Sequence, residues 1–260
     1  MLGVVIRGEA RAYPLNQLSG PDREVFNEIL GGLPVAVTWC DRCHNGIVYC
    51  REIAGRTLTF YISGKLWGDS AVLIDVETGS QWSHLLGEAM EGPLKGTKLA
   101  ELPGVVMTWR QWKSDHPSTT VSILSRTSDH YWQHRYDESS RYSAALRGDG
   151  EVVAYSLTQL REETAINERI NGKPIVLAHD AAASATVAYS RAMDGKVLEF
   201  SADDGQLLAG GSHWDITTGC AVDGPWQGRC LTRLPLVMSY REAWERFYPH
   251  GRWGAERMTQ

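Results

Sequence analysis

The chain has 260 residues, of which 43% are hydrophobic, and its formal net charge is −5. This length fits one large domain or two smaller ones, with enough apolar residues for a full core. The acidic balance argues against a nucleic-acid-binding protein, whose binding domain is usually basic. The sequence has no apolar run of about 18 residues, so no membrane span is expected.

The first residues read as the start of a strand. Residues 1–8 lack the basic start and the apolar core of about 7–15 residues that mark a signal peptide. We therefore predict a cytoplasmic protein for the chain as given, and an exported one if a leader was removed.

Most of the following segments read as short strands separated by turn residues. Strand-like segments occur at residues 4–6, 10–13, 25–30, 33–38, 47–51, 57–62, 71–76 and 81–85. Two later segments read as short helices that begin with capping boxes, one after Thr108 and one after Ser239. A core-facing tryptophan and a terminating proline follow in each: Trp112 with Pro117, and Trp244 with Pro249.

The sequence is internally duplicated. Segments of the first half recur in order in the second half: residues 8–18 at 150–160, 27–35 at 167–175, 55–60 at 195–200, and 80–82 at 212–214. We predict a first repeat over 1–124, a connection over 125–146 and a second repeat over 147–260. The expected fold is mainly β (β-rich α+β), a pseudo-two-fold antiparallel sandwich or barrel with one short helix per repeat.

Three of the five cysteines cluster in the first repeat. Cys40 and Cys43 have the two-residue spacing that lets both sulfurs reach one atom. His44 follows directly, and Cys50 lies seven residues after Cys43. The corresponding positions of the second repeat hold no cysteine: Asp180, Ala183, Ser184 and Ser190. The turn therefore does not need cysteines in order to fold, which favours a functional use. An odd number of cysteines also fits metal or redox use better than a disulfide framework.

Soft thiolates combined with imidazole suit copper(I) or zinc. We predict Cys40, Cys43, His44 and His84 as metal ligands, with Cys40, Cys43 and His44 as the catalytic residues. Copper is favoured, and zinc or iron is the alternative. Asp41 is expected either to orient a ligand or to cap the turn. His130 and His134, four residues apart, rank behind His84 as further candidates. Cys220 and Cys230 follow no zinc-knuckle spacing.

Several separated motifs resemble the bacterial and archaeal family known as domain of unknown function 3179. They are residues 8–15, 31–43, 82–83, 87–89, 92–96, 109–112 and 116–117. The resemblance implies no activity. Members of that family commonly look exported or lipid-anchored and carry Cys-Pro-Leu-Cys-Gly at this turn. Here Asp41-Arg42 replaces Pro-Leu and His44 replaces Gly, which adds a ligand or an acid/base group.

Three functions follow from this pattern. The first is a metal-dependent, copper-favoured oxidoreductase acting on a small molecule. The second is a thiol-disulfide or sulfur-handling enzyme using Cys40 or Cys43, with Cys50 as the resolving thiol. The third is a non-catalytic protein in which zinc or copper binds at the turn. The sequence predicts no nucleic-acid partner and leaves the oligomeric state open.

Overall fold

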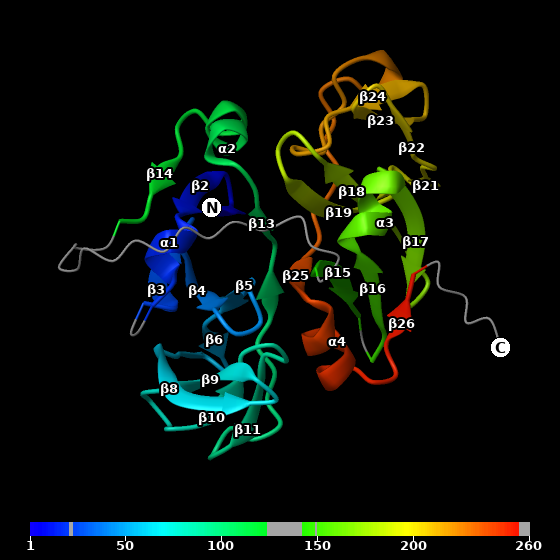
Figure 1. The fold of residues 1–260 in the computed structure, drawn as a ribbon. Helices are drawn as coiled ribbons and strands as arrows, with labels where there is room; N and C mark the ends of the chain where they lie inside the picture. The colour runs from blue at the N-terminus through cyan, green and yellow to red at the C-terminus, as the bar shows by residue number, and fades with distance from the viewer. Residues whose placement is uncertain (21–22, 124–141, 149, 255–260) are drawn as a thin grey trace. The chain divides into compact units, whose positions relative to one another are not determined.

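The computed structural model describes residues 1–20, 23–123, 142–148 and 150–254. They form a mainly β protein of small, mostly antiparallel sheets (Figure 1). Two compact units divide the chain. Unit 1 takes its described residues from Met1–Gly104, Ser118–Ser139 and Glu242–Pro249, and unit 2 from Val105–Pro117, Ser140–Arg241 and His250–Gln260. His130 and His134 lie outside the described residues.

Unit 1 contains three sheets, a two-stranded ribbon and two helices in its described part. The first sheet has four strands in the order β13 (Gly104–Val106), β1 (Leu2–Ile6), β2 (Glu9–Tyr13), β14 (Thr120–Val121). The second has the order β12 (Glu101–Leu102), β5 (Asn45–Cys50), β4 (Leu33–Cys40), β3 (Val25–Leu30). The third has the order β11 (Glu88–Glu91), β10 (Gln81–Ser83), β9 (Ser70–Asp75), β8 (Phe60–Trp67). The ribbon pairs β6 (Glu52–Ile53) with β7 (Arg56–Thr57), and the helices are α1 (Leu15–Leu18) and α4 (Arg241–Phe247). In β13 (Gly104–Val106) the chain passes from unit 1 to unit 2.

The described part of unit 2 repeats this plan, with shorter strands in the sheet that corresponds to β8 and β9. One sheet has the order β25 (Val237–Tyr240), β15 (Tyr142–Arg147), β16 (Val152–Ser156), β26 (Arg252–Trp253). Two three-stranded sheets are β17 (Ala165–Ile170), β18 (Lys173–Asp180), β19 (Ala185–Ser190), and β22 (Ser201–Asp203), β23 (Gln206–Ala209), β24 (Ser212–Trp214). The ribbon pairs β20 (Ala192–Met193) with β21 (Lys196–Val197). The helices are α2 (Trp109–Asp115), α3 (Leu157–Glu162) and the 3-10 turn η1 (Gly224–Trp226).

The duplication predicted from the sequence is confirmed by matching strand order, register and contacts. Asn27 exchanges two hydrogen bonds with the backbone of Phe60, and Asn167 does the same with Phe200. A buried arginine also recurs: Arg51 donates to three carbonyl oxygens, and Arg191 makes the equivalent contacts. The same polar side chains thus link strands in both copies.

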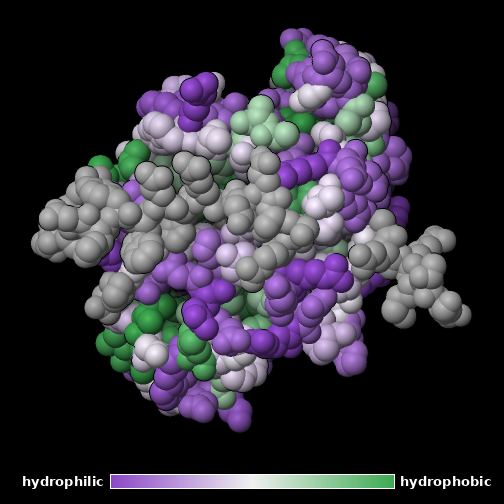
Figure 2. Space-filling model, in the orientation of Figure 1, coloured by the Kyte–Doolittle hydropathy of each residue, from purple (hydrophilic) through white to green (hydrophobic). Residues whose placement is uncertain are grey.

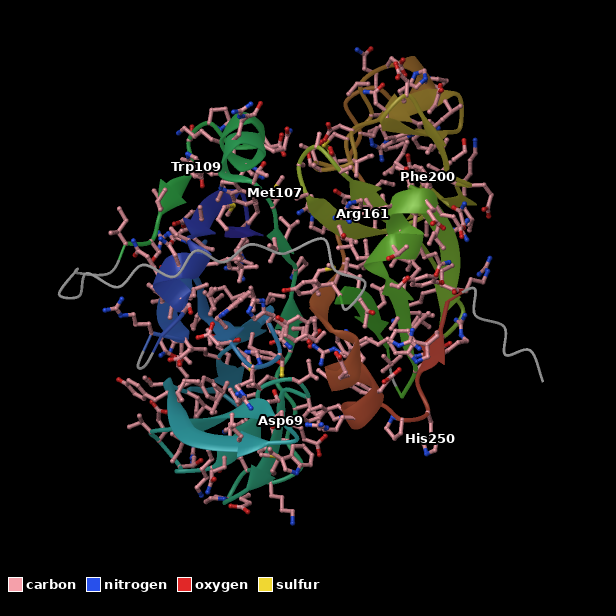
Figure 3. All side chains as sticks on the ribbon, viewed as in Figure 1. Asp69, Met107, Trp109, Arg161, Phe200 and His250 are labelled. Carbon is pink, nitrogen blue, oxygen red and sulfur yellow. A yellow bond between two sulfur atoms is a disulfide. The ribbon has the colours of Figure 1, made fainter. Side chains whose placement is uncertain are left out.

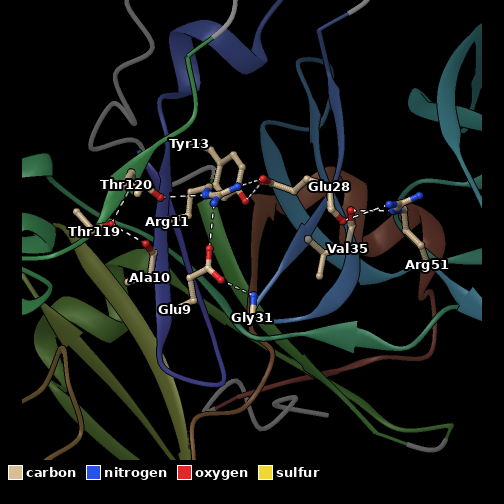
Figure 4. A network of polar contacts seen from close by, with 10 residues as sticks. All are labelled: Glu9, Ala10, Arg11, Tyr13, Glu28, Gly31, Val35, Arg51, Thr119 and Thr120. Carbon is tan, nitrogen blue, oxygen red and sulfur yellow. Dashed lines mark hydrogen bonds and ion pairs between the residues drawn. The ribbon is translucent and has the colours of Figure 1, made fainter.

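A polar network near the edge of unit 1 shows the same reuse (Figure 4). The hydroxyl of Tyr13 and the guanidinium of Arg11 both donate to the carboxylate of Glu28 (Figure 4). In unit 2 the hydroxyl of Tyr155 donates to Glu168. Burial and this hydrogen bond raise the pKa of both tyrosines, so both phenols stay protonated at neutral pH.

The structure corrects the predicted helix count and one helix start. Each copy has a second short helix, α1 or α3, directly after its second strand. Every sheet is open in the described residues, and none closes into a barrel. The predicted cap at Thr108 is present, with its side chain accepting from the backbone N–H of Gln111. Ser239, however, lies within β25, and α4 starts at Arg241. Trp112 and Trp244 are buried as predicted.

The sheet that contains β8 exposes several large apolar side chains. Hydrophobic surface appears at the lower left of Figure 2, in the region where Figure 1 places β8 and β9. The exposed side chains of this sheet and its turns are Tyr61, Leu66, Trp67 and Val76. Trp67 packs edge-to-face on Phe247 of α4, with ring centroids 5.2 Å apart. The far end of β8 is therefore the surface on which α4 lies.

Candidate functional site

The cysteine pair lies at the turn between β4 and β5, which Asp41 anchors. The indole N–H of Trp39 donates to Asp41 at 2.6 Å, and the hydroxyl of Ser19 donates to the same carboxylate at 2.8 Å. Trp39 is fully buried in the core. Of the two roles expected for Asp41, the structure supports the one in which it holds the turn in place.

The sulfur of Cys40 is surrounded by hydrogen-bond donors. It accepts the backbone N–H of Cys43 and the backbone N–H of Ala71, both at 3.4 Å. The thiol of Cys43 donates to the carbonyl oxygen of Asp69 at 3.6 Å, and the Cys43 side chain also interacts with the Cys40 sulfur. Cys40 is 1% exposed and Cys43 is 2% exposed. Backbone dipoles therefore converge on one buried sulfur.

These contacts separate the acidities of the two thiols. The pKa of Cys40 is lowered to about 7, chiefly by the hydrogen bond from Cys43, with backbone N–H groups helping and burial opposing. The pKa of Cys43 is raised, because its proton is shared with Cys40 and because it is buried. At pH 7 about half of the Cys40 thiol is therefore ionised, and above pH 7 the pair is mainly one thiolate beside one thiol.

The donor Ala71 reaches Cys40 because the hairpin of β8 and β9 is longer in the first copy. Ile62 pairs with Leu73, eleven positions later, whereas in the second copy Ala202 pairs with Leu207, five positions later. The longer hairpin turns at Gly68 and Asp69, both with positive φ (56° and 60°), and Figure 3 labels Asp69 at its tip. The copy that carries the cysteines thus also carries the extension that contacts them.

Helix α4 covers the pair from the other side within unit 1. Ala243 and Ile62 pack against the cluster of Cys40, Cys43 and Ala71. At the surface, Arg246 of α4 forms an ion pair with Asp69, and Arg42 lies 3.7 Å from the other carboxylate oxygen of Asp69. These two cations, Arg246 above all, lower the pKa of Asp69. The dithiol therefore lies under an ion-paired cover.

The two predicted histidines lie close to the turn, but their rings make other contacts. The ring of His44 lies beside that of Trp39, with centroids 5.8 Å apart. His84 is fully buried and its Nε2 lies 2.8 Å from the hydroxyl of Thr38. Its backbone N–H donates to the carbonyl of Ala71. The described residues contain no group of three or more His, Cys, Asp or Glu placed to hold a metal ion. The copper, zinc or iron site stays a prediction.

Cys50 is at the wrong end of its strand to resolve a disulfide at Cys40. Cys40 pairs with Asn45, whereas Cys50 pairs with Val35, five residues along β4. At about 3.3 Å per residue this is a separation of roughly 16 Å. Of the free cysteines, Cys43 is the one that lies beside Cys40. The two remaining cysteines, Cys220 and Cys230, form a disulfide, which the sequence analysis did not predict.

Sequence reasoning also missed Asp69, Ala71 and Arg246. The signal for the first two was in the duplication: residue 60 matches residue 200 and residue 80 matches residue 212, so the second copy is eight residues shorter over this interval. That change marks an added segment in the first copy. Arg246 carried no such signal, since it lies 177 positions from its ion-pair partner Asp69.

Together, the fold and the dithiol turn define an internally duplicated, mainly β protein with a buried Cys-x-x-Cys pair in one copy. A family model described as "Protein of unknown function (DUF3179)" matches residues 1–147 and again 135–252. The chain belongs to this family, as its motifs indicated, and each copy matches the model separately. No curated protein and no solved structure matches the chain. Among the described residues, no helix is long and apolar enough to cross a membrane.

Proposed function

We propose that this protein is a thiol-disulfide oxidoreductase in which Cys40 is the nucleophile and Cys43 is the resolving thiol. The observation that carries the proposal is the sulfur of Cys40, which accepts N–H groups from Cys43 and from Ala71 at 3.4 Å each. Donors aimed at a sulfur stabilise its thiolate, and the thiolate is the species that attacks a disulfide.

The reaction balances with the substrate disulfide as the oxidant. The Cys40 thiolate attacks one sulfur of the substrate, forming a mixed disulfide and releasing the other half as a thiolate. Cys43 then loses its proton to solvent and attacks the Cys40 sulfur, which releases the second half as a thiolate. The substrate gains two electrons and the protein is left with a Cys40–Cys43 disulfide. A second turnover requires a thiol reductant that returns the pair to the dithiol.

Trapping of the mixed disulfide tests this proposal. The reduced protein and its Cys40→Ser, Cys43→Ser and Cys50→Ser variants are mixed with excess disulfide, and the adducts are mapped by mass spectrometry. We expect a Cys40–Cys43 disulfide in the wild type and in Cys50→Ser, which serves as the control. Cys43→Ser should accumulate the mixed disulfide on Cys40, and Cys40→Ser should form none. An unmodified Cys40 in the Cys43→Ser variant would overturn the proposal.

We also propose, as a second candidate, the copper-dependent oxidoreductase expected from the sequence, acting on a small molecule. Two soft sulfur ligands on one turn, buried among Ile62, Ala71 and Ala243, favour it. His44 or His84 would complete the site, and His84 would then have to give up its contact with Thr38. Anaerobic titration with Cu(I) should give one bound ion per chain in the wild type and none in Cys40→Ser. Equal binding by both would contradict this candidate.

A further inference from the structure

Two arginines share one carboxylate at the surface above the dithiol. Arg42 lies in the turn between Cys40 and Cys43, and Arg246 comes from α4. Both pair with Asp69, which lies at the tip of the β8–β9 hairpin. A Cβ on Gly68 would lie 3.0 Å from the ring of Phe247, so the hairpin tip and α4 are in tight contact. Two positive charges thus face one negative charge.

This pair of cations is accessible and close to the reactive sulfurs. The side chains of Arg42 and Arg246 are 63% and 49% exposed. The residue that they bind, Asp69, is the one whose carbonyl oxygen lies 3.6 Å from the Cys43 sulfur. An anionic group that replaced the Asp69 carboxylate on these guanidiniums would therefore lie next to a residue that contacts the Cys43 sulfur.

The cover over the dithiol includes a contact that other anions can replace. Cys40 and Cys43 are almost fully covered, and the surface contact that holds α4 at this point is an exposed ion pair. Exposed ion pairs are weak in water and exchange readily with other anions. Each oxygen of the Asp69 carboxylate faces one of the two arginines, and guanidinium groups bind sulfonates and phosphates as well as carboxylates.

We propose that the disulfide reduced by this protein carries an anionic group, and that Arg42 and Arg246 bind this group in exchange for Asp69. The inference rests on the proposed thiol-disulfide function and names the class of its substrate. The exchange releases Arg246 from the hairpin and places the substrate disulfide beside Cys40. The covalent step is the one given above: the Cys40 thiolate attacks one substrate sulfur, and the other half leaves as a thiolate.

Reaction rates with disulfides of different charge test this inference. Stopped-flow measurements at low ionic strength would use 5,5′-dithiobis(2-nitrobenzoate), which is dianionic, 4,4′-dithiodipyridine, which is neutral, and cystamine, which is cationic. Each rate is divided by that of 2-mercaptoethanol with the same reagent, which removes intrinsic differences between the disulfides. The wild type should prefer the dianion, and the preference should decline as salt screens the guanidiniums.

The variants separate charge recognition from a structural effect. Arg42→Gln and Arg246→Gln should each slow the dianion about tenfold without slowing the neutral reagent. Asp69→Asn should speed the dianion, because it frees both arginines, and Asn tolerates the positive φ at this position. Arg229→Gln, which breaks a comparable exposed ion pair with Asp194 in unit 2, should change none of the rates.

Two failures can be told apart. Equal normalised rates for all three reagents, or an equal loss for all three in the arginine variants, would overturn the inference and leave the dithiol chemistry standing. Absence of any reaction that depends on Cys40 would overturn the proposed function itself.

Discussion

The backbone N–H of Ala71 donates to the sulfur of Cys40 at 3.4 Å, across 31 positions of the chain. This contact joins the β8–β9 hairpin to the β4–β5 turn, and it exists because the first copy has the longer hairpin. The second copy has Ala183 in place of Cys43 and a shorter hairpin. The first copy therefore has both the thiol pair and the hairpin that supplies its N–H donor, and the second copy has neither. The surrounding strands occur in both copies.

Stability should depend on pH through the same sulfur. The pKa of Cys40 falls from 9 to about 7 on folding, so above pH 7 the folded protein loses this proton before the unfolded chain does. The reduced protein should gain up to about 2 kcal/mol of unfolding free energy between pH 7 and 9, and lose it as the pH falls through 7. Above pH 9 the raised pKa of Cys43 acts in the opposite sense.

Urea unfolding of the reduced wild type and of Cys40→Ser, measured across this range, checks the prediction. The difference between the two proteins should grow from pH 7 to 9. A difference that does not change with pH would show that the Cys40 thiolate is no more stable in the folded protein than in the unfolded chain.

Two glycines should be intolerant of a side chain because a buried tyrosine fills the space. A Cβ on Gly87 would lie 2.7 Å from the ring of Tyr49, and one on Gly219 would lie 2.5 Å from the ring of Tyr189. Gly96 has a similar positive φ (84°) and open space around it. Gly96→Ala should cost about 1–2 kcal/mol of unfolding free energy for its conformation. Gly87→Ala should cost about 1–3 kcal/mol more, for overpacking.

Thermal or urea unfolding of the Gly87→Ala and Gly96→Ala variants, compared with the wild type, measures this difference. If both substitutions cost the same, the ring of Tyr49 is free to move aside, and its hydrogen bond to the carbonyl of His84 does not hold it.

Local patterns were enough to predict most strands and the duplication. Alternating apolar residues and turn glycines mark β1 to β5, and the matched tryptophans mark both copies. The same local signals were present for α3, where the side chain of Ser156 caps the helix by accepting the backbone N–H of Gln159. The start of α4 was misplaced, because Ser239 is used by β25 in pairing with Ser143. Strand pairing between distant segments outweighed a local capping signal there.

In the candidate site too, some residues could be predicted from local sequence and others could not. Cys40 and Cys43 could be found from the sequence because both lie on one short turn, and the second copy showed that the turn folds without them. The contacts of Asp69, Ala71 and Arg246 depend on the path of a hairpin and a helix that local patterns do not encode. The ring contacts of His44 with Trp39 and of His84 with Thr38 depend on packing, and the role of both histidines as metal ligands stays a prediction.

The buried arginines should be strongly stabilising because each donates to three carbonyl oxygens. Arg51 donates to the carbonyl oxygens of Val35, Leu58 and Glu28 at 3.0, 2.6 and 3.2 Å. Arg51→Met fills a similar volume and leaves these acceptors without the donor, so it should cost about 3 kcal/mol or more. Arg56→Met, at an exposed position, should stay within about 0.5 kcal/mol of the wild type. Urea midpoints compare the two, and a cost below about 1 kcal/mol for Arg51→Met would mean that the acceptors find other donors.

At matched positions, the second copy has a disulfide and the first copy has an ion pair. Cys220 and Cys230 face each other across an antiparallel bridge and form a disulfide, whereas Glu88 and Lys98 face each other in the first copy with 3.6 Å between their charged groups. Closing a loop of ten residues by a disulfide should contribute about 2–3 kcal/mol. An exposed ion pair contributes about 0–1 kcal/mol.

Replacing both members of each pair separates these contributions. Cys220→Ser with Cys230→Ser should lower the unfolding free energy by about 2–3 kcal/mol. Glu88→Gln with Lys98→Gln should leave it within about 1 kcal/mol of the wild type. The measurement is urea unfolding without reductant, repeated after reduction. Reduction should bring the wild type to the stability of the double-serine variant and leave that variant unchanged. A wild type that keeps its full stability after reduction would show that the bridge strands hold this loop without the covalent bond.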